Sequence, residues 1–399
     1  MIKEFVLHCD EADVHCILVD PYILRKLVEE TFEEAHSPCR LLCKNHVYTF
    51  AIRSVDFDDL KFGVLPKLRS SGYDIDVTYS ERIASEIPTH IHLRAHDNHA
   101  LHIVIFHQRY QWYWYGSDHN SRHHMEFTNH EGALDEFEYN FKAPIDGIEL
   151  YLPHYPKKFV YDYEQSVYIP CNISRANTFF QLHPKDTSKN ATEFKENALK
   201  AINLIKARLD KFGVPFWLSS GTLLGWFRQC DIIPYTVDVD IGVFIKDHGD
   251  GLLEKLKASS LGLDHKFGKI SDSLQYTFDM GKLKLDIFFF YEDKLTGKVW
   301  NGGTDYNSGE KFKYSFDKFT LCWSELEGIK IRVPCDTELY IKANYGPNWF
   351  TPVKNWDWKT SPFNVKPNGE WPDDELNEVI QLWDKNGKRL DLDWERQEL

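Results

Sequence analysis

The chain has 399 residues, of which 42% are hydrophobic and 27% charged. That length suggests more than one domain, and the composition is typical of a folded protein rather than a disordered one. A net charge of −14 argues against a protein that binds nucleic acid or an anionic membrane surface. No apolar run approaches the ~20 residues of a membrane span, and the N-terminus does not resemble a signal peptide.

The first half of the sequence, residues 1–183, is predicted to form one mixed α/β domain. Asp20 followed by Pro21 favours a helix start, because aspartate caps the first turn and proline fits its first position. Apolar residues at helical spacing extend this helix to His36. Short apolar runs then predict strands over residues 48–52, 101–107 and 111–115.

Histidine, cysteine and asparagine patterns in this half leave several possibilities open. Ten of the 18 histidines lie between His90 and His130, and we interpret them as solvated because no spacing matches a zinc site. Cys39 and Cys43 could be zinc ligands, could each form one half of a separate disulfide, or could be two buried thiols. Asn172 and Asn190 begin N-glycosylation sequons in polar, exposed-looking segments, so both are candidate glycosylation sites.

A polar stretch over residues 183–190 marks the predicted boundary of a second domain, residues 184–399. An amphipathic helix is expected from Phe194 to Leu209 and ends at Gly213. The elements expected after it are a strand over 214–218, a Ser-Ser-Gly-Thr loop over 219–222, a helix over 223–229, a strand over 239–245 and a hairpin of 274–278 with 283–291.

Three aspartates carry the chemistry that the second domain suggests. Asp238 and Asp240 are two residues apart at a strand start, so both side chains point to one face. Two carboxylates on one face repel each other unless a cation lies between them, and Mg²⁺ or Mn²⁺ suits oxygen ligands. A solvated strand end is the alternative. Asp286 lies within an apolar strand, where a buried carboxylate needs a partner or a metal.

The loop before the short helix suggests a phosphate site. Small residues let a phosphate approach the backbone, and a helix N-terminus offers free N–H groups. A strand, a Ser/Gly loop, a helix, a strand with Asp-x-Asp and a later strand with a third aspartate is the layout of polymerase-β-like nucleotidyltransferases. We therefore expect an α/β (α+β) fold whose catalytic domain performs metal-dependent phosphoryl transfer.

The motifs of this domain resemble those of the LicD and fukutin-related phosphotransferase family. The resemblance is dense from about Val214 to Trp383 and thinner over residues 1–183, where it implies a stem domain. The segments that carry it span residues 215–235, 238–242, 284–291, 300–303 and 355–359.

The resemblance implies an enzyme of the Golgi lumen that transfers ribitol 5-phosphate from CDP-ribitol to a sugar hydroxyl of an O-mannosyl glycan, releasing CMP. The acceptor would be a dystroglycan-like glycoprotein, and other Golgi glycosylation enzymes are possible partners. The family also implies a membrane anchor, which this sequence does not show. We expect that the sequence begins too late, rather than that the anchor is truly absent.

By the same resemblance, Asp238, Asp240 and Asp286 would hold Mg²⁺ or Mn²⁺, and Asp286 would also take the hydroxyl proton. Donor phosphates would be bound by Ser220, Gly221, Thr222 and Arg228. For Arg228, a surface salt bridge is the alternative role. Trp356, Trp358 and Trp371 either stack on acceptor sugars or pack the C-terminal lobe.

Other functions remain open on the residues alone. The cargo could be phosphocholine or glycerol phosphate, as in LicD-type enzymes. A GT-A glycosyltransferase would also carry Asp-x-Asp, but it needs neither Asp286 nor the Ser-Gly-Thr loop. A non-catalytic Golgi partner that binds glycan or stabilises another transferase is a further possibility, although it has little reason to retain a buried Asp286.

Overall fold

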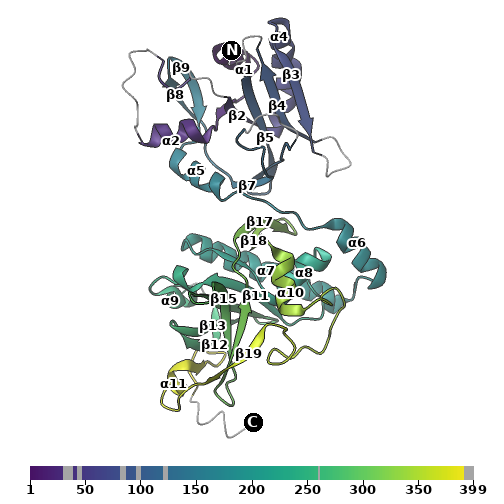
Figure 1. The fold of residues 1–399 in the computed structure, drawn as a ribbon, viewed down its shortest axis with the longest axis vertical. Coiled ribbons are helices and arrows are strands. Elements are labelled where there is room, and N and C mark those ends of the chain that lie inside the picture. The colour runs from purple at the N-terminus through teal and green to yellow at the C-terminus, as the bar shows by residue number, and fades with distance from the viewer. Residues whose placement is uncertain are drawn as a thin grey trace. The chain divides into compact units, whose positions relative to one another are not determined.

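A computed structural model describes residues 1–29, 39–42, 47–80, 87–95, 100–119, 125–258 and 261–390. The chain divides into two compact units, Met1–Ile169 and Pro170–Leu399 (Figure 1). Both units combine helices with sheets, which confirms the predicted α/β class. No helix within the described ranges is long and apolar enough to cross a membrane.

The first unit is built on one mixed sheet with the strand order β3-β4-β5-β2-β1-β9-β8, and β6 and β7 continue from β5. Its strands are β1 (Ile17–Leu18), β2 (Tyr48–Arg53), β3 (Asp74–Tyr79), β4 (Pro88–Arg94), β5 (Ala100–Arg109), β6 (Trp112–Tyr115), β7 (Gly132–Asp135), β8 (Phe141–Ile145) and β9 (Ile148–Leu152). Its helical segments are α1 (Ile2–Glu11), α2 (Pro21–Glu29), η1 (Ser54–Asp56), α3 (Phe57–Asp59), η2 (Leu60–Val64), α4 (Leu65–Ser70) and α5 (Pro156–Glu164).

The predicted helix and the three predicted strands correspond to α2, β2, β5 and β6, and the other elements of this unit were not predicted. Helix α2 begins at Pro21, and the Asp20 carboxylate accepts hydrogen bonds from the N–H groups of Ile23 and Thr49. The continuation of this helix to His36 and the state of Cys43 lie outside the described residues. Cys39 is disulfide-bonded, so its thiolate is not available to zinc.

Three of the histidines form a buried row on β4 and β5, so the interpretation of solvated histidines is wrong for them. His90, His92 and His102 are at most 7% exposed. His90 Nδ1 lies 2.9 Å from His102 Nε2, and His102 Nδ1 lies 3.3 Å from Thr49 Oγ1. The rings stack at 5.1 to 6.3 Å between centroids. His96, His99, His123 and His124 lie outside the described residues.

This row should make the first unit sensitive to acid. Burial lowers the pKa of His90 to about 4, and lowers that of His102 well below its usual range. A depressed pKa means that the unfolded state binds more protons, so stability is lost as the pH falls from about 6.5 towards 4. The lowered pKa of His90 alone would reduce the free energy of unfolding by about 3 kcal/mol over this pH range.

Hydrogen exchange of the β4 and β5 amides should therefore lose protection over that window, after correction for the intrinsic exchange rate. The amides of the second unit serve as the internal control. An equal loss of protection in both units would attribute the change to general acid unfolding and not to the histidines.

The second unit is built on a mainly antiparallel sheet with the strand order β19-β16-β15-β14-β13-β12-β20, and β11 joins β14 in parallel while β10 pairs with β11. Its strands are β10 (Phe216–Leu218), β11 (Asp238–Phe244), β12 (Gly262–Lys269), β13 (Asp272–Asp279), β14 (Lys284–Asp293), β15 (Lys298–Thr304), β16 (Glu310–Phe316), β17 (Leu321–Leu326), β18 (Ile329–Pro334), β19 (Val365–Glu370) and β20 (Ile380–Leu382). Its helical segments are α6 (Ile173–Leu182), α7 (Lys189–Lys211), α8 (Ser220–Gln229), η3 (Ile245–Asp247), α9 (Leu252–Lys257), α10 (Thr337–Tyr345) and α11 (Leu376–Val379).

Local patterns explain the elements from α7 to β14 of this unit. Helix α7 buries its apolar stripe and ends before Gly213, whose φ of 68° favours glycine. Strands β13 and β14 form the expected hairpin, and Thr277 lies opposite Asp286. Trp217 on β10 is fully buried among Phe244, Phe290 and Phe319. Gly242 faces Trp217 so closely that an added Cβ would lie 2.3 Å from the indole.

Helix α6 belongs to the second unit, although the boundary predicted at residue 183 placed it in the first. Both α6 and α10 pack against α8 (Figure 1). Cys171, just before α6, forms a disulfide with Cys230 at the end of α8, and this covalent link explains why the chain divides earlier than its polar stretch suggests. Both sequon residues are exposed, Asn172 as the cap of α6 and Asn190 in α7, so their glycosylation stays a prediction.

Candidate active site

Three carboxylates meet where β11 and β14 run side by side. The parallel register places Asp240 opposite Asp286, and Asp238 lies on the same face as Asp240 because side chains alternate along a strand. One carboxylate oxygen from each aspartate lies within 4.8 Å of the others. The structure thus brings together the three residues that the sequence analysis singled out.

The electrostatics of this cluster favour a bound cation. Burial, and next the charge of Asp286, raise the pKa of Asp238 to about 6. Burial and the two neighbouring carboxylates raise the pKa of Asp240 well above its usual range, and burial raises that of Asp286. Within the described ranges, no lysine, arginine or histidine forms an ion pair with any of the three. The charges of His265 and Lys284 act to lower the pKa of Asp286, but neither side chain forms an ion pair with it. Three adjacent carboxylates, one buried and two half-buried, without a directly paired cation fit a divalent metal.

The loop between β10 and α8 is fastened to the Asp240 backbone and side chain. The Ser219 N–H donates to the Asp240 carbonyl at 3.0 Å, and the Gly221 N–H donates to Asp240 Oδ2 at 3.1 Å. Ser220 has a φ of 40°, in the left-handed region that non-glycine residues seldom adopt. The loop therefore holds Ser220 and Gly221 beside the carboxylates at the start of α8.

Thr222 has a different position from the one that the phosphate-binding prediction requires. Its side chain is buried, and its Oγ1 accepts a hydrogen bond from the Asp240 N–H at 2.9 Å. Ser220 and Gly221 line the adjacent cavity, whereas Thr222 is not among the lining residues. Thr222 thus fixes the Asp-x-Asp strand, and the structure does not support its contact with a donor phosphate.

A cavity of about 650 Å³ opens above the carboxylates, large enough for a nucleotide-sized ligand. Its wall combines the three aspartates with cationic, amide and aromatic side chains from α8, β15, α10 and the segment after α10. The additional lining residues used below are Arg228, Asn301, Gly303, Tyr345, Trp356 and Trp358.

Arg228 is one of the cationic residues that line this cavity, together with Lys354 and Lys359. It is 1% exposed, so the alternative role in a surface salt bridge is wrong. Its Nη2 donates to Gln229 Oε1 at 2.9 Å, its Cζ lies 4.5 Å from the centroid of the Phe179 ring, and burial lowers its pKa. No carboxylate of the described chain pairs with it. A buried guanidinium without an anionic partner is suited to a phosphate.

Another wall of the cavity combines two tryptophans with residues that the sequence analysis did not assign. Trp356 lies 4.8 Å from Tyr345 between ring centroids, and Trp358 packs so closely on Gly303 that an added Cβ would lie 2.8 Å from its ring. Asn301 and Gly303 belong to a motif that the sequence analysis quoted without giving it a role. Two successive glycines inside a strand were the available signal, because they mark a close approach of another group.

The tryptophans separate into two groups. Trp356 and Trp358 line the cavity, as a role in stacking on a ligand requires. Trp371 is buried in a small cluster with Phe267 and Val379, and its indole N–H donates to Thr304 Oγ1 at 3.1 Å. Trp371 therefore packs the C-terminal lobe, and stacking on a sugar is wrong for it.

Two family models match parts of this chain. The model of the LicD/FKTN/FKRP nucleotidyltransferase domain matches residues 213–336, which include the loop, Arg228 and all three aspartates. The model of the fukutin N-terminal region matches residues 1–199.

Similarity to individual proteins extends over nearly the whole chain. The human protein named "Ribitol-5-phosphate transferase FKTN" is 40% identical over 412 residues, covering 96% of this chain and 88% of that protein. The human "Ribitol 5-phosphate transferase FKRP" is 43% identical over 149 residues, covering 35% of this chain and 29% of that protein. An uncharacterized Caenorhabditis elegans protein is 29% identical over 241 residues, covering 57% of this chain and 59% of that protein.

Proposed function

The chain belongs to the fukutin family of transferases, and on that premise we propose that it transfers ribitol 5-phosphate from CDP-ribitol to a sugar hydroxyl of a protein O-mannosyl glycan, releasing CMP. The acceptor protein would be dystroglycan-like. The observation that carries the proposal is one cavity lined by three adjacent carboxylates, of which Asp240 is buried and the other two are half-buried, and by a buried arginine that no carboxylate of the described chain pairs with.

Asp238, Asp240 and Asp286 would hold Mg²⁺ or Mn²⁺, which when bound neutralises charge on the donor phosphates. Arg228 would bind a phosphate oxygen, and the loop at Ser220 and Gly221 would lie against the donor. These groups orient the donor so that its alditol-bearing phosphorus faces the acceptor hydroxyl.

Asp286 is the best placed group to take the acceptor proton. Thr277 Oγ1 and Gln275 Nε2 both donate to Asp286 Oδ1, which fixes the carboxylate. No hydrogen bond to Oδ2 comes from the described residues, so this oxygen can face a hydroxyl. The new bond joins the acceptor oxygen to phosphorus, the bond from phosphorus to CMP breaks, and the hydroxyl proton moves to Asp286.

The disulfides support a place in the secretory pathway, and we propose the Golgi lumen with membrane association. Cys171 pairs with Cys230 and Cys322 with Cys335, and such bonds persist in oxidising compartments. Because Cys230 is in a disulfide, it is not available as a nucleophile.

The proposal is tested by measuring CMP release from CDP-ribitol, CDP-glycerol and CDP-choline, with an O-mannosyl glycan acceptor and either Mn²⁺ or Mg²⁺. We expect metal-dependent release from CDP-ribitol. Release from CDP-glycerol or CDP-choline alone would show that ribitol 5-phosphate is not the transferred group, while the phosphotransfer reaction itself would stand. No release from any donor by folded protein would favour a non-catalytic binding role.

Metal affinity should depend on pH through the same carboxylates. Because their pKa values are raised, protons compete with the cation at a higher pH than for ordinary aspartates. Calorimetry with Mn²⁺ should show an affinity that falls by up to about tenfold for each pH unit below about 6. An affinity that stays constant between pH 7 and 5 would contradict this assignment of the site.

The raised pKa values also predict that the metal-free second unit gains stability as the pH falls. A raised folded pKa contributes stability at low pH that is lost as the pH rises through it, near 6 for Asp238. Bound Mn²⁺ should reduce this dependence, and thermal unfolding with and without the metal measures the difference.

A further inference from the structure

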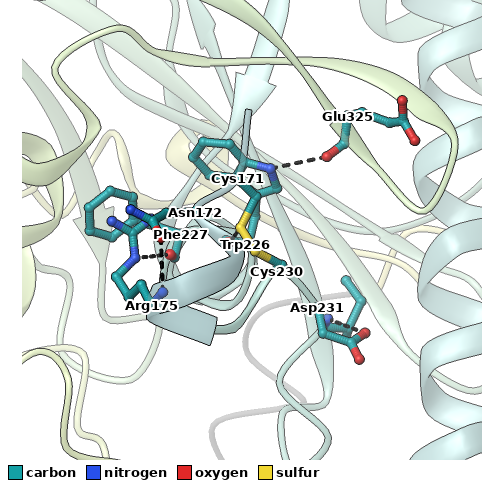
Figure 2. The surroundings of a disulfide bond; sticks show 9 residues. Cys171, Asn172, Arg175, Trp226, Phe227, Cys230, Asp231 and Glu325 are labelled. Carbon is teal, nitrogen blue, oxygen red and sulfur yellow. Dashed lines mark hydrogen bonds between the residues drawn. A yellow bond between two sulfur atoms is a disulfide. The ribbon is translucent and has the colours of Figure 1, made fainter. Parts of the chain in front are cut away.

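The last turn of α8 is held by the segment that contains α6. A disulfide joins Cys171, before α6, to Cys230, the residue that ends α8, and their Cα atoms lie 5.6 Å apart (Figure 2). The two cysteines are 59 residues apart in sequence. The end of α8 is therefore tied covalently to a segment that lies outside the β10–α8–β11 catalytic motif.

Arg175 strengthens the same junction from the first turn of α6. Its Nε donates to the Phe227 carbonyl at 2.7 Å, and its Cζ lies 3.6 Å from the centroid of the Phe227 ring. Asn172 Oδ1 in turn accepts a hydrogen bond from the Arg175 N–H at 2.9 Å (Figure 2). The hydrogen bond from Arg175 satisfies the Phe227 carbonyl near the end of α8, where the last carbonyls of a helix lack partners within the helix.

Ion pairs hold the turn that follows α8. Asp231 is 4% exposed, and its carboxylate pairs with Lys185 at 2.6 Å and with Lys195 at 2.8 Å. Lys185 follows α6 and Lys195 lies in α7. One continuous segment, residues 171–195, thus contacts α8 and its turn at several successive points.

Arg228 lies within this junction and faces the cavity. The ring of Phe179, on α6, lies 4.5 Å from the Arg228 Cζ and is itself 4% exposed. Phe350 packs against the Phe179 ring in an edge-to-face contact, with 5.5 Å between the ring centroids. Gln229 Oε1 accepts from Nε and Nη2 of Arg228. One face of the guanidinium therefore rests on α6. Tyr235 also hydrogen-bonds to the Arg228 side chain, and both residues line the cavity, where a ligand can reach them.

We propose that α6, through Phe179 and the Cys171–Cys230 disulfide, is a positioning element that holds the Arg228 guanidinium ready for the phosphates of a nucleoside diphosphate. This inference rests on the proposed function, because it assigns Arg228 to the donor. An arginine side chain has four rotatable bonds, and fixing them before binding lowers the entropy that binding loses. Phe179 is a positioning residue and does not itself contact the donor.

The test measures CDP binding in the presence of Mn²⁺ by calorimetry, which does not depend on turnover. Phe179→Leu keeps an apolar side chain but removes the aromatic face, and we expect it to raise the Kd for CDP about tenfold. The stoichiometry should stay near that of the wild type. A variant that only lost folded protein would lower the stoichiometry at an unchanged Kd. The matched control is Phe180→Leu, on the same helix.

The disulfide is tested by the double variant Cys171→Ser/Cys230→Ser, which should raise the Kd for CDP severalfold. The double variant Cys322→Ser/Cys335→Ser removes the bond between β17 and β18 and should leave the Kd unchanged. In a background that lacks Arg228, Phe179→Leu should have no further effect, because the two residues act as one unit.

Equal CDP affinities for wild type and Phe179→Leu would overturn the inference, as would an equal effect of the two disulfide variants or a wild type that does not bind CDP. The proposed function fails differently. It fails if the wild type binds CDP but releases no CMP from CDP-ribitol, and the affinities of the variants then still decide the role of α6.

Discussion

Asp240→Asn should lower kcat for CMP release by at least about a thousandfold and leave the chain folded. Asparagine keeps the shape of the side chain, and its amide oxygen can still accept the Gly221 N–H that Asp240 Oδ2 accepts at 3.1 Å. The backbone bonds to Ser219 and Thr222 do not depend on the side chain. The lost charge is the one that a divalent cation would contact.

The same variant should stabilise the metal-free protein at neutral pH. Burial and two neighbouring carboxylates raise the pKa of Asp240, so its ionised form is unfavourable in the fold, and asparagine removes that repulsion. Activity and stability should thus move in opposite directions, which separates inactivation from unfolding. Thermal unfolding without metal checks the second part.

The control is Asp279→Asn, the same change at the exposed end of β13, where the carboxylate accepts from the Gly281 N–H. It should leave kcat within about twofold of the wild type. Wild-type activity in Asp240→Asn would remove this residue from the reaction, and so would an equal loss in both variants.

Arg228→Met should lower kcat/KM for the donor about a hundredfold, chiefly through KM. Charge-assisted hydrogen bonds between a guanidinium and a phosphate contribute about 1.5–3 kcal/mol in a water-excluded site. Methionine fills much of the space beside Phe179 without supplying a donor or a charge. The measurement is the initial rate of CMP release over a range of CDP-ribitol concentrations.

Arg208→Met is the matched control, since it makes the same change on α7 away from the cavity lining. It should leave the KM for the donor unchanged. If Arg228→Met retained the wild-type KM, Arg228 would be a packing residue with no role in donor binding.

The sequence allowed a correct prediction of the elements around the active site because their signals are local. The apolar stripe of α7, the glycine after it and the hairpin of β13 and β14 all follow from spacing within a few residues. The pairing of Asp240 with Asp286 is different. It depends on the parallel register of β11 and β14, which a strand pattern does not specify.

The predictions that were wrong also depended on tertiary contacts, which local sequence does not specify. A threonine in a Ser-Ser-Gly-Thr loop has the chemistry of a phosphate ligand, yet tertiary structure directs the Thr222 hydroxyl to the Asp240 backbone. Polar residues before α7 resembled a domain boundary, and cysteine spacing could not reveal that Cys171 pairs with Cys230. A histidine-rich composition likewise does not distinguish solvated side chains from the buried row of His90, His92 and His102.

The most direct test of the metal-dependent transfer account is an anomalous-scattering map from crystals grown with Mn²⁺ and CDP. The account predicts manganese between the carboxylates of Asp238, Asp240 and Asp286, with the CDP phosphates between the metal and the Arg228 guanidinium. Bound CDP with no manganese at these carboxylates, or manganese bound elsewhere in the protein, would contradict it.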